Sequence, residues 1–149
     1  MVGHPHLDEV VTPALGVVAL ERCALSVLTT VTSRPADDRL IVDAGSKALA
    51  AERLTTLTPG FGRVVDRPEL TVARLYEEQG IVTSAGPCEV PTGARLRVVP
   101  NHACTAANLH DRMLVEEDGA LGDSWPVSFR GWRSLRCDPE PAELANPGA

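Results

Sequence analysis

The sequence predicts a mainly β domain, either a small barrel or a sandwich-like fold, with one or two short helices. Short runs of β-branched residues recur along the chain, and Gly, Pro and Asp separate them. We find no internal repeat, heptad or long amphipathic helix in the sequence. With 149 residues, of which 44% are hydrophobic, the chain has the length and apolar content of one domain with its own core.

The first predicted elements lie in the amino-terminal half. In residues 23–33, hydrophobic residues alternate with Ser and Thr, which is the period of a half-buried strand. Residues 40–43 form a second predicted strand, which Gly45 ends. Ser46 then has the side chain of a helix cap and predicts a short helix over residues 47–53.

The second half predicts four more strands, at residues 70–76, 94–99, 112–116 and 125–130. Asp118-Gly119 is a favourable hairpin turn between the last two. Gly60-Phe61-Gly62 is interpreted as a turn and not as a phosphate-binding loop, because no helix signature follows it. Six short strands with turns between them are typical of a barrel or a sandwich.

The two ends differ from the middle of the chain. Residues 1–13 show no clear period, and residues 137–149 contain three prolines, a glycine and several acids. Both are expected to be flexible, which leaves residues 14–136 as the domain. The two tryptophans, Trp125 and Trp132, are expected to be core or interface anchors.

Charge and hydropathy argue against two classes of partner. The formal net charge is −6, so no broad attraction to nucleic acid or to an anionic membrane is expected. The longest apolar stretch, residues 14–20, is too short to span a membrane and lacks the basic region of a signal peptide. We therefore expect a cytoplasmic protein, in which the four cysteines are free thiols or ligands: Cys23, Cys88, Cys104 and Cys137.

The segment with the clearest chemistry is Val98 to Asn108, which begins at the end of an apolar strand. If the backbone stays extended beyond Pro100, the side chains of His102 and Cys104 project to one side. An imidazole nitrogen and a thiolate are favoured ligands of zinc. Spacing alone favours a buried thiol and a hydrogen-bonded histidine over a metal site, and the neighbouring sequence is what favours the metal.

Two protein ligands leave the coordination shell of zinc incomplete, so two kinds of metal site are possible. An open site would leave positions for water and substrate and would support Lewis-acid chemistry. A closed, structural site would recruit His110 or Asp111, which follow closely in the sequence. The sequence does not choose between them.

Five segments, in order along the chain, resemble the carboxy-terminal domain of the D-serine dehydratase and D-threonine aldolase family: CALSVLTTVTSRP (23–35), IVDAGSKAL (41–49), LYEEQG (75–80), RVVPNHACTAANLHD (97–111) and VSFRGW (127–132). The resemblance implies an alanine racemase-like, fold-type III enzyme whose amino-terminal barrel binds pyridoxal phosphate on a lysine. It also implies that His102 and Cys104 bind zinc. In aldolase relatives an acidic residue can replace the cysteine, with manganese or another divalent ion. Cys104 therefore favours zinc and the dehydratase.

The implied substrate is a D-3-hydroxy amino acid, with D-serine dehydration expected first and D-threonine aldol cleavage second. No cofactor barrel fits ahead of residue 14, so the isolated chain is expected to be inactive without a barrel domain. Lys47, the only lysine, is interpreted as a structural or surface residue, and Gln79 replaces the histidine of the family's frequent EEHG segment. Two alternatives stay open: a non-catalytic binding or dimerisation module, with a possible homodimer, and a structural zinc domain.

Overall fold

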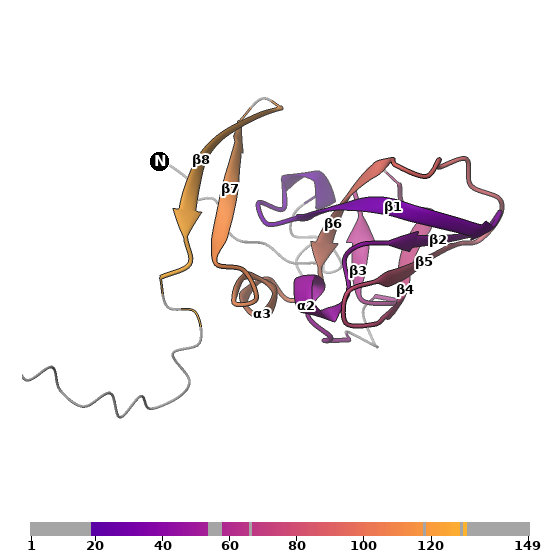
Figure 1. Ribbon diagram of the computed structural model, residues 1–149, viewed down its shortest axis with the longest axis horizontal. Helices are drawn as coiled ribbons and strands as arrows, with labels where there is room; N and C mark the ends of the chain where they lie inside the picture. Colours follow the sequence, from indigo (N-terminus) through magenta and orange to yellow (C-terminus); the bar gives the residue numbers. More distant parts are fainter. Residues whose placement is uncertain (1–18, 54–57, 66, 118, 129, 131–149) are drawn as a thin grey trace, which may run out of the picture.

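The computed structural model describes residues 19–53, 58–65, 67–117, 119–128 and 130 (Figure 1). Six antiparallel strands close into a barrel in the order β1-β2-β5-β4-β3-β6, and β7 and β8 form a separate hairpin. The predicted mainly β fold is confirmed, and the fold is a barrel. The predicted flexible ends, residues 1–13 and 137–149, lie outside the described residues.

The elements have the following bounds. The strands are β1 (Val27–Ala36), β2 (Arg39–Val42), β3 (Gly62–Val64), β4 (Leu70–Leu75), β5 (Gly80–Ser84), β6 (Arg95–Pro100), β7 (Arg112–Glu117) and β8 (Ala120–Pro126). The helical segments are the 3-10 helix η1 (Leu20–Arg22) and two short α-helices, α2 (Ser46–Leu49) and α3 (Ala103–Ala107).

Several predicted boundaries were wrong. The predicted helix over residues 47–53 ends at Leu49, because Ala50 takes a positive φ of 61° that no helix continues. The strand predicted at residues 125–130 is β8, which starts at Ala120. Gly119 adopts a φ of 80°, so the chain reverses within the predicted turn, and β8 pairs with β7 from Ala120 onward. Strands β3 and β5 and helix α3 were not predicted.

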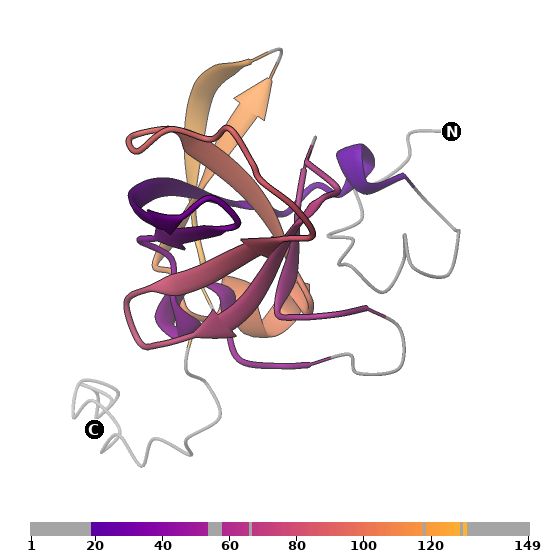
Figure 2. The same ribbon diagram turned by 90° about the vertical axis from the view of Figure 1, so that its right-hand side faces the viewer.

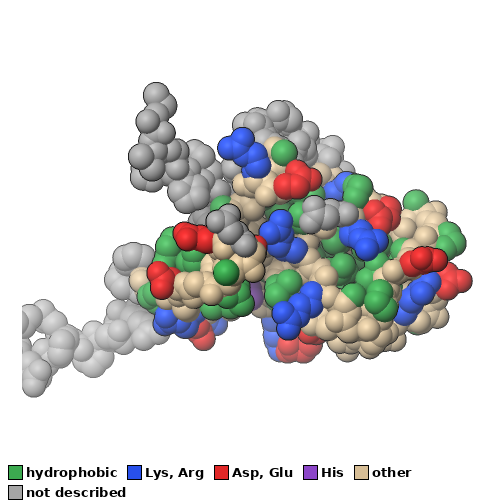
Figure 3. All heavy atoms as spheres, turned by 90° about the horizontal axis from the view of Figure 1, so that it is seen from above, with side chains coloured by type: hydrophobic (Ala, Val, Ile, Leu, Met, Phe, Trp, Pro, Cys, Tyr) green, Lys and Arg blue, Asp and Glu red, His purple; other side chains and the backbone are tan. Residues whose placement is uncertain are grey.

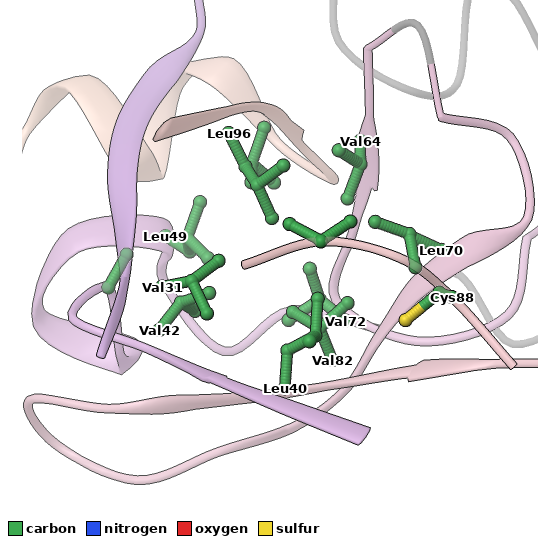
Figure 4. Close-up of a cluster of buried hydrophobic side chains, with 13 residues drawn as sticks. Val31, Leu40, Val42, Leu49, Val64, Leu70, Val72, Val82, Cys88 and Leu96 are labelled. Carbon is green, nitrogen blue, oxygen red and sulfur yellow. The ribbon is translucent and has the colours of Figure 1, made fainter. Parts of the chain in front are cut away.

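The core fills the barrel. Each barrel strand sends alternate side chains inward, and the largest of these are Val and Leu residues with almost no exposed surface (Figure 4). Val31, Leu40, Val72 and Val82 have 0% of their surface exposed. The buried thiol of Cys88 joins this cluster, and Cys23, Cys88 and Cys104 form no disulfide within the described part of the chain. Cys137 lies outside the described residues.

The hairpin of β7 and β8 projects from the barrel (Figure 2). Its strands pair only with each other, from Arg112 opposite Pro126 to Glu117 opposite Ala120. Trp125 on β8 is 55% exposed, so it does not lie in the core, and its alternative role as an interface anchor stays a prediction. Trp132 lies outside the described residues. Within the described ranges, no helix is long and apolar enough to cross a membrane.

Candidate metal centre

Strand β6 leads directly into the His-x-Cys segment. It is held on one side by β1 and on the other by β3, and its residues Val98 and Val99 are fully buried. Asn101 follows and is 1% exposed. The next residue, His102, is half-buried, keeps an extended backbone with φ −138° and ψ 112°, and precedes helix α3. The barrel therefore fixes the point at which this segment begins.

The backbone does not remain extended to Cys104. Helix α3 starts at Ala103, so the strand alternation that was expected to place His102 and Cys104 on one side does not apply, and that part of the prediction was wrong. Three of the five residues in α3 are alanine, the best helix former. Thr105 Oγ1 donates to the carbonyl of His102 at 3.1 Å, and the N–H of Ala106 donates to the same oxygen at 3.2 Å.

His102 and Cys104 thus occupy the cap and the first turn of a short helix. Cys104 is exposed, and Ala103 between the two residues is buried. The pair combines one nitrogen and one sulfur donor within three residues, a donor set that suits zinc. That they bind one ion together stays a prediction.

Asn101 was not among the predicted site residues. Its side-chain Nδ2 donates to the carbonyl oxygens of Glu52 at 2.9 Å and Gly60 at 3.0 Å. Its Oδ1 is buried without a hydrogen-bond partner among the described residues. The sequence signal that could have indicated Asn101 is a carboxamide directly after an apolar strand. A polar side chain buried at such a place needs hydrogen-bond partners, so it is expected to connect segments of the fold.

His110 and Asp111, the residues predicted to close a structural shell, have other contacts. His110 Nε2 lies 3.0 Å from the carbonyl oxygen of Ala48, at the end of α2. Asp111 forms an ion pair with Arg130, whose Nε also donates to the carbonyl of Asn108 at 3.2 Å. Across the described residues, no three His, Cys, Asp or Glu side chains gather into a group that could hold a metal ion.

Two charged groups near the barrel rim have shifted pKa values. The hydroxyl of Thr29, at 2.6 Å, and then the N–H of Thr30 lower the pKa of Asp43 by donating hydrogen bonds to its carboxylate. Lys47 forms ion pairs with Glu78 and Glu77, which raise its pKa. These contacts agree with the interpretation of Lys47 as a surface residue, because they hold its amine in the charged form.

The sequence matches known proteins over most of its length. A family model described as "Putative serine dehydratase domain" matches residues 24–116. An uncharacterized protein of Mycobacterium tuberculosis is 39% identical over 122 residues, which cover 78% of this chain and 91% of that protein. D-threonine aldolase of Arthrobacter sp. is 40% identical over 118 residues, which cover 78% of this chain but only 29% of the enzyme.

A solved structure shares the fold. The D-threo-3-hydroxyaspartate dehydratase of Delftia sp. HT23 superposes with a TM-score of 0.69 and 33% identity, over 80% of this chain and 36% of that chain. Two further structures named D-threo-3-hydroxyaspartate dehydratase have a histidine replaced by alanine and, in the metal-free form, a cysteine replaced by alanine. The positions in those two names are separated by one residue, the spacing of His102 and Cys104 here.

Proposed function

Since this chain belongs to the D-serine dehydratase-like domain family, we propose that it is the metal-binding β domain of a pyridoxal-phosphate lyase for D-3-hydroxy amino acids. The observation that carries the proposal is the His-x-Cys pair after β6, which has the same spacing as the histidine and cysteine substituted in D-threo-3-hydroxyaspartate dehydratase. D-threonine and D-threo-3-hydroxyaspartate, the substrates in the names of two relatives, both have a hydroxyl group on the β carbon. Of the candidate reactions, we propose D-serine dehydration as the first choice and D-threonine aldol cleavage as the second. We also propose that the protein is cytoplasmic.

The residues present fit an open zinc site. Cys104 is exposed and His102 is half-buried, so neither residue is enclosed in the core. Two protein ligands would leave coordination positions on a tetrahedral ion for water and substrate. A zinc ion bound there would supply a Lewis acid for the substrate hydroxyl. His102 and Cys104 would hold and orient that ion.

The residues present do not fit pyridoxal phosphate. The cofactor needs an amine, and the only lysine of the chain is Lys47. Its ion pairs with Glu77 and Glu78 raise its pKa, whereas a reactive lysine needs a lowered one. The chain spans about a third of the dehydratase and aldolase relatives, so we propose that the cofactor comes with a barrel domain and that this chain is inactive without it.

Metal binding tests this proposal directly. The wild-type protein, loaded with zinc and dialysed without chelator, is expected to retain about one zinc ion per chain by elemental analysis, as for a specific site. Cys104→Ala and His102→Ala should each lose more affinity than the about 10–100-fold that an outer-shell residue contributes. Cobalt loading should give a thiolate-to-metal absorption band that disappears in Cys104→Ala.

The matched control is Cys23→Ala, which removes another thiol that is not fully buried and lies before β1. It should leave both zinc content and the cobalt band unchanged. A wild-type protein that retains no zinc, or a Cys104→Ala protein that retains it, would refute the metal-binding proposal.

The hairpin supports a second candidate function, self-association. Leu114 and Leu121 are 65% and 67% exposed, and a two-stranded hairpin with exposed apolar residues is only marginally stable in water. In an antiparallel pairing of two β7 strands centred on Leu114, Arg112 of each copy would lie opposite Glu116 of the other. Hydrophobic and acidic side chains lie next to each other at the end of the surface where the hairpin is (Figure 3). We propose a second copy of this chain as its partner.

Sedimentation velocity across a concentration series tests the dimer. Glu116→Arg should weaken association by about 10-fold, because two cations would then face each other, and adding Arg112→Glu should restore it. Asp123→Arg, the same charge change on β8, is the control and should have little effect. A wild-type protein that stays monomeric at high concentration, or a double variant no better than Glu116→Arg, would contradict this pairing.

A further inference from the structure

Residues 101–110, the segment with the proposed metal ligands, are hydrogen-bonded near both ends to carbonyl groups in or after α2. Asn101, directly before His102, donates to the carbonyls of Glu52 and Gly60. His110, after α3, contacts the carbonyl of Ala48 through Nε2 at 3.0 Å. Helices α2 and α3 consequently lie side by side near the end of β6 (Figure 1). Two side chains therefore bracket His102 and Cys104.

Two of the acceptors of these hydrogen bonds lie on either side of a strained residue along the chain. Ala50 has φ 61° and ψ 174°, a conformation that residues with a Cβ rarely adopt, and it is 9% exposed. Ala48 and Glu52, whose carbonyls accept from His110 and Asn101, lie two residues before and two residues after it. The turn at Ala50 therefore lies between the two carbonyls to which His110 and Asn101 are hydrogen-bonded.

The contact of His110 determines which ring nitrogen carries the proton. A carbonyl oxygen only accepts hydrogen bonds, so Nε2 carries a hydrogen and donates it to Ala48. Nε2 is therefore not available as a metal ligand while this bond holds. His110 also does not gather with His102 and Cys104 into a three-ligand group within the described part of the chain.

We propose that His110 is a positioning residue: with Asn101 it holds residues 101–110 against the turn at Ala50, and it acts on the metal through this segment and not as a ligand. This inference rests on the proposed function for its effect on zinc. The positioning itself is a property of the metal-free protein and can be measured without zinc.

The experiment compares His110→Ala with His110→Gln. Glutamine retains an N–H donor at about the place of Nε2, whereas alanine removes it. Hydrogen exchange of the metal-free protein is read at the amides bonded within this segment, that of Ala106 in α3 and those of Asn108, Leu109 and His110 directly after it, together called the α3 amides. His110→Ala should speed their exchange by about 10-fold, the factor of one net hydrogen bond, and His110→Gln should stay near wild type.

Zinc affinity gives the second readout. His110→Ala should lose about 10–100-fold in affinity, as outer-shell residues do, and His110→Gln should restore most of the loss. Thr29→Val is the matched control, because it removes a side-chain hydrogen bond to Asp43 elsewhere on the barrel. It should lower the melting temperature without changing α3 exchange or zinc affinity.

Three results would overturn the proposal. The first is unchanged α3 exchange in His110→Ala, and the second is equal acceleration in Thr29→Val. The third is a His110→Gln protein with wild-type exchange that has lost zinc, because that result makes His110 a ligand. If the wild type binds no zinc, the proposed function fails, and the exchange comparison alone still decides whether His110 positions the segment.

Discussion

Gly45→Ala is expected to destabilise the protein by about 4 kcal/mol or more, which is exceptional for one methyl group. A Cβ atom at this position would lie 2.3 Å from the carbonyl oxygens of both Tyr76 and Glu77 and 2.6 Å from the backbone nitrogen of Gln79. All three are backbone atoms, so no rotation of a side chain relieves the clash. The start of α2 would have to leave the β4–β5 turn, and the hydrogen bonds from Ser46 to Tyr76 and from Lys47 to Glu77 would be lost.

Urea denaturation followed by circular dichroism measures this loss. Gly86→Ala is the control, because a Cβ there meets nothing within 4 Å. It should change the free energy of unfolding by no more than about 0.5 kcal/mol. A Gly45→Ala protein as stable as Gly86→Ala would show that α2 does not pack against the β4–β5 turn in solution.

Leu40→Ala should produce the second large effect, a loss of about 3–4 kcal/mol. Leu40 lies on β2, pairs with Val82 on β5 and is 0% exposed inside the barrel. Closure of the barrel limits how far its strands can move inward, so the cavity left by the smaller side chain cannot collapse fully. The same denaturation measurement applies, with no change expected in the slope of the transition.

Leu28→Ala is the matched control for the core variant. Leu28 lies on β1 but is 59% exposed, so the same chemical change should cost less than about 1 kcal/mol. Equal losses in the two leucine variants would mean that the leucine of β2 is not inside the barrel.

Local sequence patterns predicted the elements that are long or strongly alternating. The regular runs gave β1, β2, β4 and β6, and the Asp118-Gly119 turn gave the hairpin. Strand β3 has only three residues, and it exists because Arg63 pairs with Val99 on one side and with Thr71 on the other. Pairing between segments far apart in the chain decides such a strand, and no local pattern reports it.

For the candidate site, only the local conformation could be compared with the prediction. That His102 and Cys104 bind a metal stays a prediction, whereas helix α3 was missed because the apolar strand up to Pro100 favoured an extended continuation. The alanines and Thr105 were the contrary local signal. The bond from His110 to Ala48 spans 62 positions in the chain, so only the folded structure could reveal it.

A barrel closed on itself leaves none of its six strands with a free edge for another sheet to extend. The barrel of such a domain can be joined to a larger neighbour, or separated from it, without leaving an unpaired barrel strand at the surface. The relatives fit this modular behaviour: the same unit makes up most of the mycobacterial protein, at 91%, and a minor part of the Arthrobacter aldolase, at 29%.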